Sequence, residues 1–261
     1  MSNGSYVSVE AEAAEREVAR LRAQAAGLWA KERENLVALG VRAGLRHLDL
    51  GCGPAANLRQ LGAEFPPRLA VGVDRDGELL RRGLGAGLAL LRADVGRLPL
   101  AAHSFDLVTA RLVLRHLPAP AALLYEARRV VVPGGMVLVT DGDDDSWALD
   151  PTPPGWTELS QALGATARRR GGEPGMGRRL RRLLLEAGLV DVRVRLSPIS
   201  TEDIAARAWV EMLLAPDARP IDADLMSPDQ ARAHWAQVRA WATRPDAFGW
   251  VMGVTAAGVA P

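Results

Sequence analysis

Cysteine and lysine are both nearly absent from this chain of 261 residues. Cys52 is the only cysteine, which excludes a disulfide framework and any zinc site built from several cysteines. Cys52 lies between two glycines, where a small side chain is needed, and we assign it no redox role. Lys31 is the only lysine, so arginine carries almost all of the positive charge.

The chain also lacks a strong net charge and any long hydrophobic run. Its formal net charge of +1 gives no overall field that would attract nucleic acid or an anionic membrane. No stretch approaches the roughly 20 apolar residues of a membrane span. The acidic N-terminal segment lacks the apolar core of a secretory signal. We therefore expect a cytoplasmic protein that binds neither nucleic acid nor a membrane.

From residue 46 onward, short apolar runs alternate with helical stretches, which is typical of a parallel sheet covered by helices on both faces. Strands are predicted at 46–50, 69–73, 88–92, 105–109, 135–140, 190–196 and 247–256. Apolar residues at helical spacing over 9–39 predict one or two amphipathic helices before them. The expected fold is one α/β domain over 1–261, with a helical lid at 1–40 and a cofactor-binding core at 41–145.

After Asp141 the regular alternation breaks down. "DGDDDSWALDPTPPGW" is acidic and proline-rich and is interpreted as an irregular loop, and residues 197–245 are long and mostly helical. We expect insertions at 146–175 and 199–245 to cap the substrate site. Six of the seven tryptophans lie beyond residue 146. They either fill a core or line an apolar, aromatic substrate pocket.

The stretch "LDLGCGPAAN" at 48–57 places a glycine loop between a predicted strand and a predicted helix. Gly51 and Gly53 let the backbone turn sharply and leave room for a ligand against the main chain. The spacing matches G-x-G-x-x-G/A, the fingerprint of dinucleotide-binding loops. By itself this pattern arises often by chance.

Acidic residues stand at the ends of three successive predicted strands, namely Asp49, Asp74 and Asp94. In an open α/β sheet these ends face one crevice. Asp74 is placed to accept hydrogen bonds from two ribose hydroxyls, and Asp94 with the Val95 N–H is placed to bind an adenine ring. Turn formation and helix capping are the alternatives for Asp74 and Asp94. Arg75 either covers the adenine face or is solvated.

Charge separates two candidate ligands for this crevice. A nicotinamide dinucleotide would bring two phosphate charges close to Asp49, which would repel them. S-adenosylmethionine carries no phosphate, and its sulfonium and α-ammonium groups are both cationic. The acidic strand ends therefore favour S-adenosylmethionine as the cofactor.

The motifs "HLDLGCGPA", "VGVDRD", "RADVGRLPL…FDLV", "ARLVLRHLPAP" and "ARRVVVPGGMVLVTDGD" follow one another along the chain. In this order the chain resembles the class I S-adenosylmethionine-dependent methyltransferases, most of all the small-molecule branch related to the ubiquinone/menaquinone-biosynthesis enzymes. The resemblance covers about residues 15–145 and resumes at "GMGRRLRRLLLEAGLVDVRV". It implies a Rossmann-like, seven-stranded, mostly parallel sheet with helices on both faces and an antiparallel last strand.

The resemblance also implies roles for single residues. It places Gly51 to Gly53 at the methionine part of the cofactor and Arg111 near the cofactor's carboxylate, a pairing that the fork of arginine favours. Where the family often has a third glycine this chain has Ala55, which we expect to adopt a negative φ. The acidic strand ends and the resemblance together give the candidate cofactor-binding residues, which are Asp49, Gly51, Cys52, Gly53, Asp74, Arg75, Asp94, Val95 and Arg111.

His116, just after the fourth predicted strand, is the candidate catalytic residue. It would act as a general base or orient the substrate, and the alternative is a structural histidine in the turn before Pro118. The candidate substrate contacts are Tyr6, Trp29, Asp141, Asp143 and Trp147.

Two features suggest other ligands. Clustered carboxylates in "DGDDDSW" suit magnesium or calcium. The segment nevertheless resembles a metal-independent subgroup, so we expect no metal and solvated side chains at Asp144 and Asp145.

The arginines between 168 and 182 suggest RNA, but no aromatic residues are interleaved with them. We expect them to form the wet face of a helix.

The sequence therefore predicts transfer of a methyl group to oxygen, nitrogen or carbon of a small, largely apolar acceptor, such as a specialised bacterial metabolite. One alternative is an S-adenosylmethionine-binding protein that catalyses a non-methylating reaction or acts as an accessory protein. Another is a nicotinamide-dependent oxidoreductase. The acceptor is the one partner that we expect, and a homodimer is left open.

Overall fold

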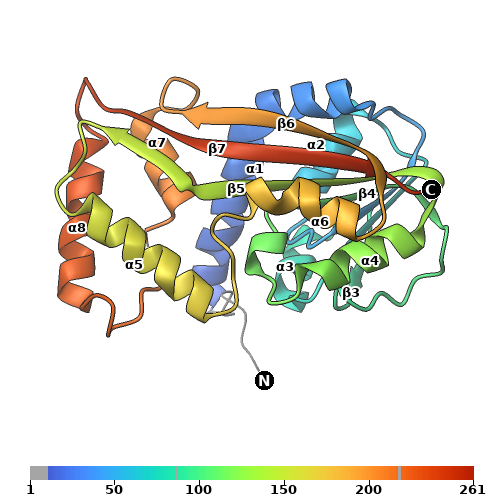
Figure 1. The fold of residues 1–261 in the computed structure, drawn as a ribbon, viewed down its shortest axis with the longest axis horizontal. Helices are drawn as coiled ribbons and strands as arrows, with labels where there is room; N and C mark the ends of the chain where they lie inside the picture. The colour runs from blue at the N-terminus through green and yellow to red at the C-terminus, as the bar shows by residue number, and fades with distance from the viewer. Residues whose placement is uncertain (1–10, 86, 217–218) are drawn as a thin grey trace.

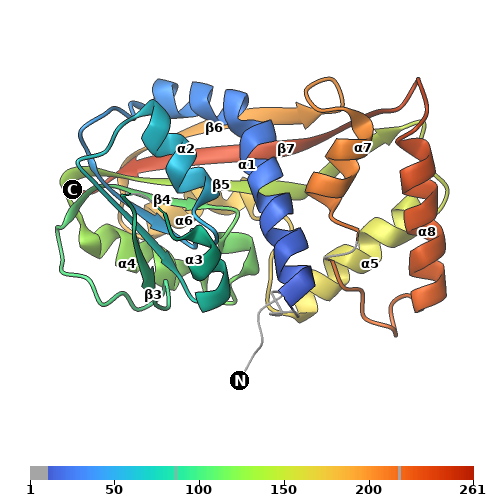
Figure 2. The same cartoon turned by 180° about the vertical axis from the view of Figure 1, so that it is seen from behind.

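A computed structural model of the chain describes residues 11–85, 87–216 and 219–261 (Figures 1 and 2). Its strands form one seven-stranded sheet in the order β3-β2-β1-β4-β5-β7-β6, and β7 runs antiparallel to both of its neighbours. The predicted Rossmann-like architecture is confirmed. The strands are β1 Arg46–Leu50, β2 Leu69–Asp74, β3 Ala89–Arg92, β4 Phe105–Arg111, β5 Val131–Asp150, β6 Val190–Ser200 and β7 Phe248–Val259.

Helices cover both faces of this sheet. The longer helices are α1 Ala11–Leu39, α2 Ala56–Glu64, α4 Pro120–Val130, α5 Trp156–Arg169 and α8 Pro228–Trp241. The shorter ones are α3 Gly77–Gly83, α6 Leu180–Glu186, α7 Ala206–Trp209 and the single-turn or irregular segments η1 Leu114–His116, η2 Gly177–Arg179 and η3 Val210–Leu214. Where one or two N-terminal helices were expected, α1 is one continuous helix. No helix of the described part of the chain is both long and apolar enough to cross a bilayer.

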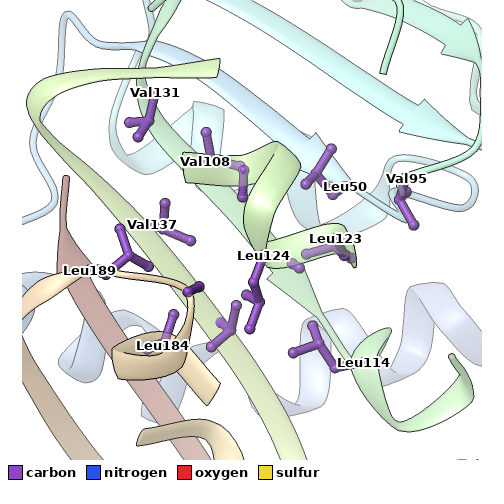
Figure 3. Packing of buried hydrophobic residues seen from close by; sticks show 14 of the residues in the cluster. Leu50, Val95, Val108, Leu114, Leu123, Leu124, Val131, Val137, Leu184 and Leu189 are labelled. Carbon is purple, nitrogen blue, oxygen red and sulfur yellow. The ribbon is translucent and has the colours of Figure 1, made fainter. Parts of the chain in front are cut away.

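The main core lies between the sheet and helices α4 and α6 (Figure 3). Leu50 and Val108 point from β1 and β4 toward Leu123 and Leu124 of α4, and all four are at most 1% exposed. Because neighbouring residues of a strand point to opposite faces, His47 and Asp49 of β1 are directed toward the other face, which α1 and α2 cover. One face of the central strands is therefore apolar, and the other carries buried polar groups.

β5 is much longer than the strand predicted at 135–140. The acidic run after it was interpreted as a loop, and this interpretation was wrong. Pairing with β7 continues through Asp141, Gly142 and Asp143, breaks at a bulge, and resumes at Ala148 opposite Trp250. Backbone hydrogen bonds with β7 hold this segment extended despite its low intrinsic preference for a strand.

The extensions of β5, β6 and β7 reach a second lobe formed with α5, α7 and α8 (Figure 1). Four tryptophans fill the core of this lobe: Trp156, Trp209, Trp235 and Trp241. For these four, the core interpretation is confirmed. Leu28 of α1 belongs to the same cluster, while Leu36 of α1 packs on the sheet. Helix α1 thus contacts both lobes.

Trp209 is the largest side chain that is wholly buried in the second lobe, and its indole N–H donates to the Ile199 carbonyl at 3.2 Å. We expect Trp209→Ala to lower the free energy of unfolding by about 3–5 kcal/mol, because it removes packing and leaves a cavity. Urea denaturation measures this change. Leu196→Ala, at a side chain that is 64% exposed, should change the same quantity by less than about 0.5 kcal/mol. Equal effects of the two substitutions would contradict this account of the lobe.

Candidate active site

The glycine loop leaves β1 through three left-handed positions, each two residues after the one before. Gly51, Gly53 and Ala55 have φ values of 71°, 52° and 55°. A Cβ atom at Gly51 would lie 2.4 Å from Cγ2 of Val113, so this position also needs glycine for space. The expectation of a negative φ at Ala55 was wrong. The Ala55 methyl is wholly buried against Leu58 and Ala70, and this packing offsets part of the backbone strain.

Asp74, at the end of β2, holds the glycine loop in place. Its Oδ2 accepts the Gly53 N–H at 2.8 Å and its Oδ1 accepts the Asp76 N–H at 2.9 Å. Burial raises the pKa of Asp74, and these backbone hydrogen bonds oppose that effect. Each carboxylate oxygen keeps a second lone pair, so the same group can still accept from two hydroxyls.

The end of β3 brings the remaining adenine-site candidates to the same edge of the sheet. Asp94 is exposed, and its Oδ1 accepts the Gly96 N–H at 2.8 Å. Val95 is buried at 8% exposure, and Arg75 is exposed beside Asp74. Asp94 thus forms a turn, which was one of the alternatives predicted for it, and its side chain remains accessible.

Asp49 is a buried carboxylate, 2% exposed, on the face of the sheet that α1 covers. The hydroxyl of Thr109 donates to its Oδ1 at 2.7 Å, and Nε2 of His47 lies 2.8 Å from the same hydroxyl oxygen. Burial raises the pKa of Asp49 to about 7, although the Thr109 hydrogen bond and Arg111 lower it. Cys52, also buried, has its thiol pKa raised by burial, which makes it unreactive.

Arg111 ends β4 and forms an ion pair with Glu32 of α1, with 2.7 Å between Nε and Oε1. Its Nη2 is buried and has no hydrogen-bond partner among the described residues. The guanidinium lines a small cavity of about 20 Å³, and the polar residues Glu32, Asn57, Thr109 and Thr140 also line it. Glu32 was not predicted from the sequence, where it is one of several charges on a helix.

These residues fit S-adenosylmethionine. Asp49 and Asp74 are largely buried carboxylates whose raised pKa values reflect too little compensation of their negative charge. A sulfonium and an ammonium group would supply this compensation, whereas a pyrophosphate would worsen the repulsion. The orphaned Nη2 of Arg111 can donate to a carboxylate.

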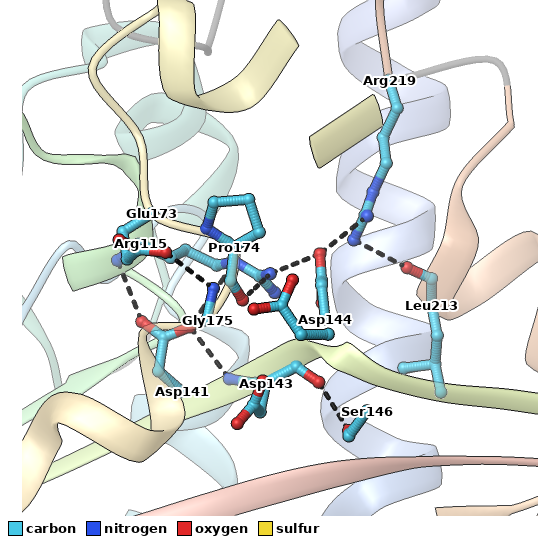
Figure 4. A network of polar contacts seen from close by, with 12 residues as sticks. Arg115, Asp141, Asp143, Asp144, Ser146, Glu173, Pro174, Gly175, Leu213 and Arg219 are labelled. Atoms are coloured by element: carbon cyan, nitrogen blue, oxygen red, sulfur yellow. Dashed lines mark hydrogen bonds and ion pairs between the residues drawn. The ribbon is translucent and has the colours of Figure 1, made fainter. Parts of the chain in front are cut away.

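A second polar cluster lies between the two lobes (Figure 4). Asp144 binds Arg115, which follows β4, at 2.5 Å and Arg219, from the segment before α8, at 3.0 Å. Burial opposes ionisation of Asp144, but the two arginines hold its pKa below the usual range. The expectation that Asp144 is solvated was therefore wrong. No sequence pattern marked Arg219, which lies in the long segment between β6 and β7.

Asp141 and His116 belong to this cluster. Asp141 accepts the Arg115 N–H at 3.1 Å, and burial raises its pKa to about 6. Burial, with Arg115 and Arg219, lowers the pKa of His116 to about 3, so its imidazole is neutral near pH 7. Trp147 is nearby, packed edge-on against Trp209 with 4.9 Å between ring centroids.

The remaining candidate substrate contacts lie elsewhere. Asp143 points away from Asp144 and pairs with Arg178 of η2 at 2.6 Å (Figure 4). It lines a separate groove of about 460 Å³ with Trp250 and Met252. Trp29 packs against the apolar cluster between α1 and the sheet. Tyr6 lies outside the described residues. Among those residues no three His, Cys, Asp or Glu side chains form a group that could hold a metal ion.

The raised pKa of Asp49 makes stability depend on pH. The folded protein holds a proton on Asp49 up to about pH 7, while an unfolded chain loses it near the ordinary aspartate pKa of 3.8. The free energy of unfolding should therefore fall as the pH rises through this window, by up to about 1.4 kcal/mol per pH unit.

Asp49→Asn should remove this contribution, because the amide does not titrate. Urea denaturation across the window should show that the wild-type free energy of unfolding falls relative to that of the variant. Asp229→Asn, at a side chain that is 88% exposed, is the control. If the free energies of unfolding of wild type and Asp49→Asn change with pH in parallel, the raised pKa of buried Asp49 is refuted.

Comparisons with known proteins agree with this geometry. A family model described as a methyltransferase domain matches residues 48–139. A demethylmenaquinone methyltransferase from Beutenbergia cavernae is 36% identical over 125 residues, which cover 46% of this chain and 50% of that protein. The chain spans about half the length of the curated relatives that it matches.

Solved structures share the fold. A chain of the complex between the Haloferax volcanii Trm112 methyltransferase activator and a methyltransferase aligns with a TM-score of 0.60 at 19% identity, covering 97% of this chain and 100% of that chain. Phosphoethanolamine N-methyltransferase 2 from Haemonchus contortus, solved with S-adenosyl-L-methionine, gives 0.57 at 20% identity, covering 89% and 53%. The matched domain, the related methyltransferase sequences and the sheet order together indicate a class I S-adenosylmethionine-dependent methyltransferase.

Proposed function

We propose that this protein transfers a methyl group from S-adenosylmethionine to a small, largely apolar acceptor bound between the two lobes. The observation that carries the proposal is the pair of poorly compensated carboxylates, Asp49 and Asp74, beside the glycine loop. This arrangement suits a cationic cofactor without phosphate. The bound cofactor would supply an electrophilic methyl group on a positively charged sulfur. The neutral thioether that remains after transfer is a good leaving group.

The protein's own residues supply binding, orientation and exclusion of water. Asp74 would accept the ribose hydroxyls, Asp94 and the Val95 N–H would bind the adenine, and Arg111 would bind the carboxylate. Helix α1 covers this edge, since Leu21 comes within 3.8 Å of where a Cβ of Gly53 would lie. Such positioning can provide much of the catalysis in a displacement reaction.

The acceptor would lie where the end of β4 faces the second lobe. Trp147, packed on the buried Trp209, provides an aromatic surface, which favours an apolar acceptor. Asp141 and His116 are the nearby groups able to bind a polar atom on it. A specialised metabolite with one nucleophilic oxygen, nitrogen or carbon meets these requirements. The proposal does not require a second copy of the chain.

The ribose assignment of Asp74 can be tested by calorimetry with S-adenosylhomocysteine. Asp74→Ala should weaken binding by about 2–4 kcal/mol, because two hydrogen bonds to a charged acceptor are lost. Asp76→Ala is the matched control, since Asp76 caps α3 beside the loop through the Glu78 and Leu79 N–H groups. Comparable losses in both variants would indicate that Asp74 only supports the loop.

His116 is expected to orient the acceptor instead of removing a proton, because its neutral imidazole is a weak base in this environment. His116→Ala should lower turnover by at least about tenfold, with little change in affinity for S-adenosylhomocysteine. Turnover can be followed with labelled S-adenosylmethionine and a panel of small phenols, hydroquinones and amines. His116→Gln should retain more activity than His116→Ala. Loss of folding stability in proportion to turnover would favour a purely structural histidine.

A further inference from the structure

We propose that His47 and Thr109 form a buried hydrogen-bond relay that orients the Asp49 carboxylate toward the cationic amino-acid end of the cofactor. The proposal rests on the proposed function for the identity of that ligand. The hydrogen bonds of the relay are observed directly in the structure.

The register of two central strands creates the relay. β1 and β4 pair in parallel with Asp49 opposite Thr109 and His47 opposite Leu107. Residues two apart on a strand share a face, so His47 and Asp49 lie on the same side of β1 with Thr109 beside them. His47, Asp49 and Thr109 are all at most 3% exposed. Water therefore does not compete for these hydrogen bonds.

The direction of each hydrogen bond follows from the chemistry of the groups. A threonine hydroxyl has one proton, and its possible acceptors are Asp49 Oδ1 at 2.7 Å, His47 Nε2 at 2.8 Å and the Leu48 carbonyl at 3.5 Å. The shorter contact to a carboxylate is the stronger one. With its proton on Asp49, the hydroxyl accepts from His47, so Nε2 of His47 carries the hydrogen.

The other ring nitrogen supports this assignment. Nδ1 of His47 is buried and has no hydrogen-bond partner among the described residues. A bare lone pair in that position costs less than an unpaired N–H would, and a charged ring is disfavoured because burial lowers the pKa of His47 to about 4. The imidazole is thus held in one neutral form, which donates to Thr109.

The relay lowers the pKa of Asp49, whereas burial raises it. The other charged groups that act on Asp49 are Arg111 at the end of β4, which favours its ionised form, and Asp74 and Glu32, which oppose it. The Thr109 hydroxyl, fixed by His47, favours the ionised form and holds Oδ1 in one orientation. His47 and Thr109 are positioning residues, because they act on the cofactor through Asp49.

The decisive experiment compares two ligands over a range of pH. S-adenosylhomocysteine carries the α-ammonium group, and 5′-methylthioadenosine lacks the amino-acid part. In Thr109→Val the affinity for S-adenosylhomocysteine should fall about tenfold or more near pH 6.5. The loss should shrink as the pH rises, because Asp49 ionises at a higher pH in the variant. Affinity for 5′-methylthioadenosine should change less than twofold, and Thr109→Ser should restore the wild-type profile.

His47 provides a second and milder pair of variants, in which the bond between Thr109 and Asp49 can persist. His47→Leu removes the donor and should shift the same pH profile in the same direction by a smaller amount. His47→Gln, which keeps an N–H donor, should shift it less than His47→Leu. Equal losses for both ligands, or a loss that is the same at every pH, would overturn the relay.

A carboxyl ¹³C titration of Asp49 in the ligand-free protein separates the relay from the choice of cofactor. The titration midpoint should be higher in Thr109→Val than in wild type, and an unchanged midpoint would refute the relay. If wild-type protein binds neither ligand, the proposed cofactor site fails, while this titration still decides whether the relay exists.

Discussion

The antiparallel pairing of β5 with β7 is the interaction on which the rest of the molecule depends. It runs from Met136 in the core to Asp150 in the second lobe, and β6 joins the sheet only through β7. The same ladder that completes the sheet therefore carries the second lobe. It also fixes the acidic part of β5 between the lobes, where Asp141 and Asp144 meet residues that lie far away in sequence.

Buried carboxylates in this protein fall into two groups with opposite electrostatics. Asp144 is neutralised by two arginines, so its charge is satisfied in the protein itself. Within the described ranges Asp49 and Asp74 receive hydrogen bonds but no ion pair, and they stand at the ends of adjacent strands. Burying charge without a counter-ion is unfavourable unless a ligand provides one. The first group lies at the junction of the lobes, and in the proposed function the second group would receive the cationic cofactor.

The part of the fold that local patterns determine could be predicted, and the part that depends on distant contacts could not. Apolar runs and the glycine loop located all seven strands, and the spacing of Asp74 and Asp94 placed both at the same edge of the sheet. The acidic segment after Asp141 looked irregular because its partner strand lies more than a hundred residues later. Arg219 and Asp144 were missed for the same reason, since neither is close to the other or to Arg115 in sequence. Ala55 was misjudged because the tight turn demanded a left-handed residue whatever its side chain.

Helix α1 spans both lobes, and its contact with the tip of β6 uses the chain's only lysine. Nζ of Lys31 donates to the Pro198 carbonyl at 2.6 Å and lies 3.1 Å from Oδ2 of Asp203. No other side chain in the sequence carries an amine. An amine-directed reagent therefore meets a single side-chain target, and the rate at which Lys31 reacts reports how firmly Pro198 and Asp203 hold its ammonium group against the tip of β6.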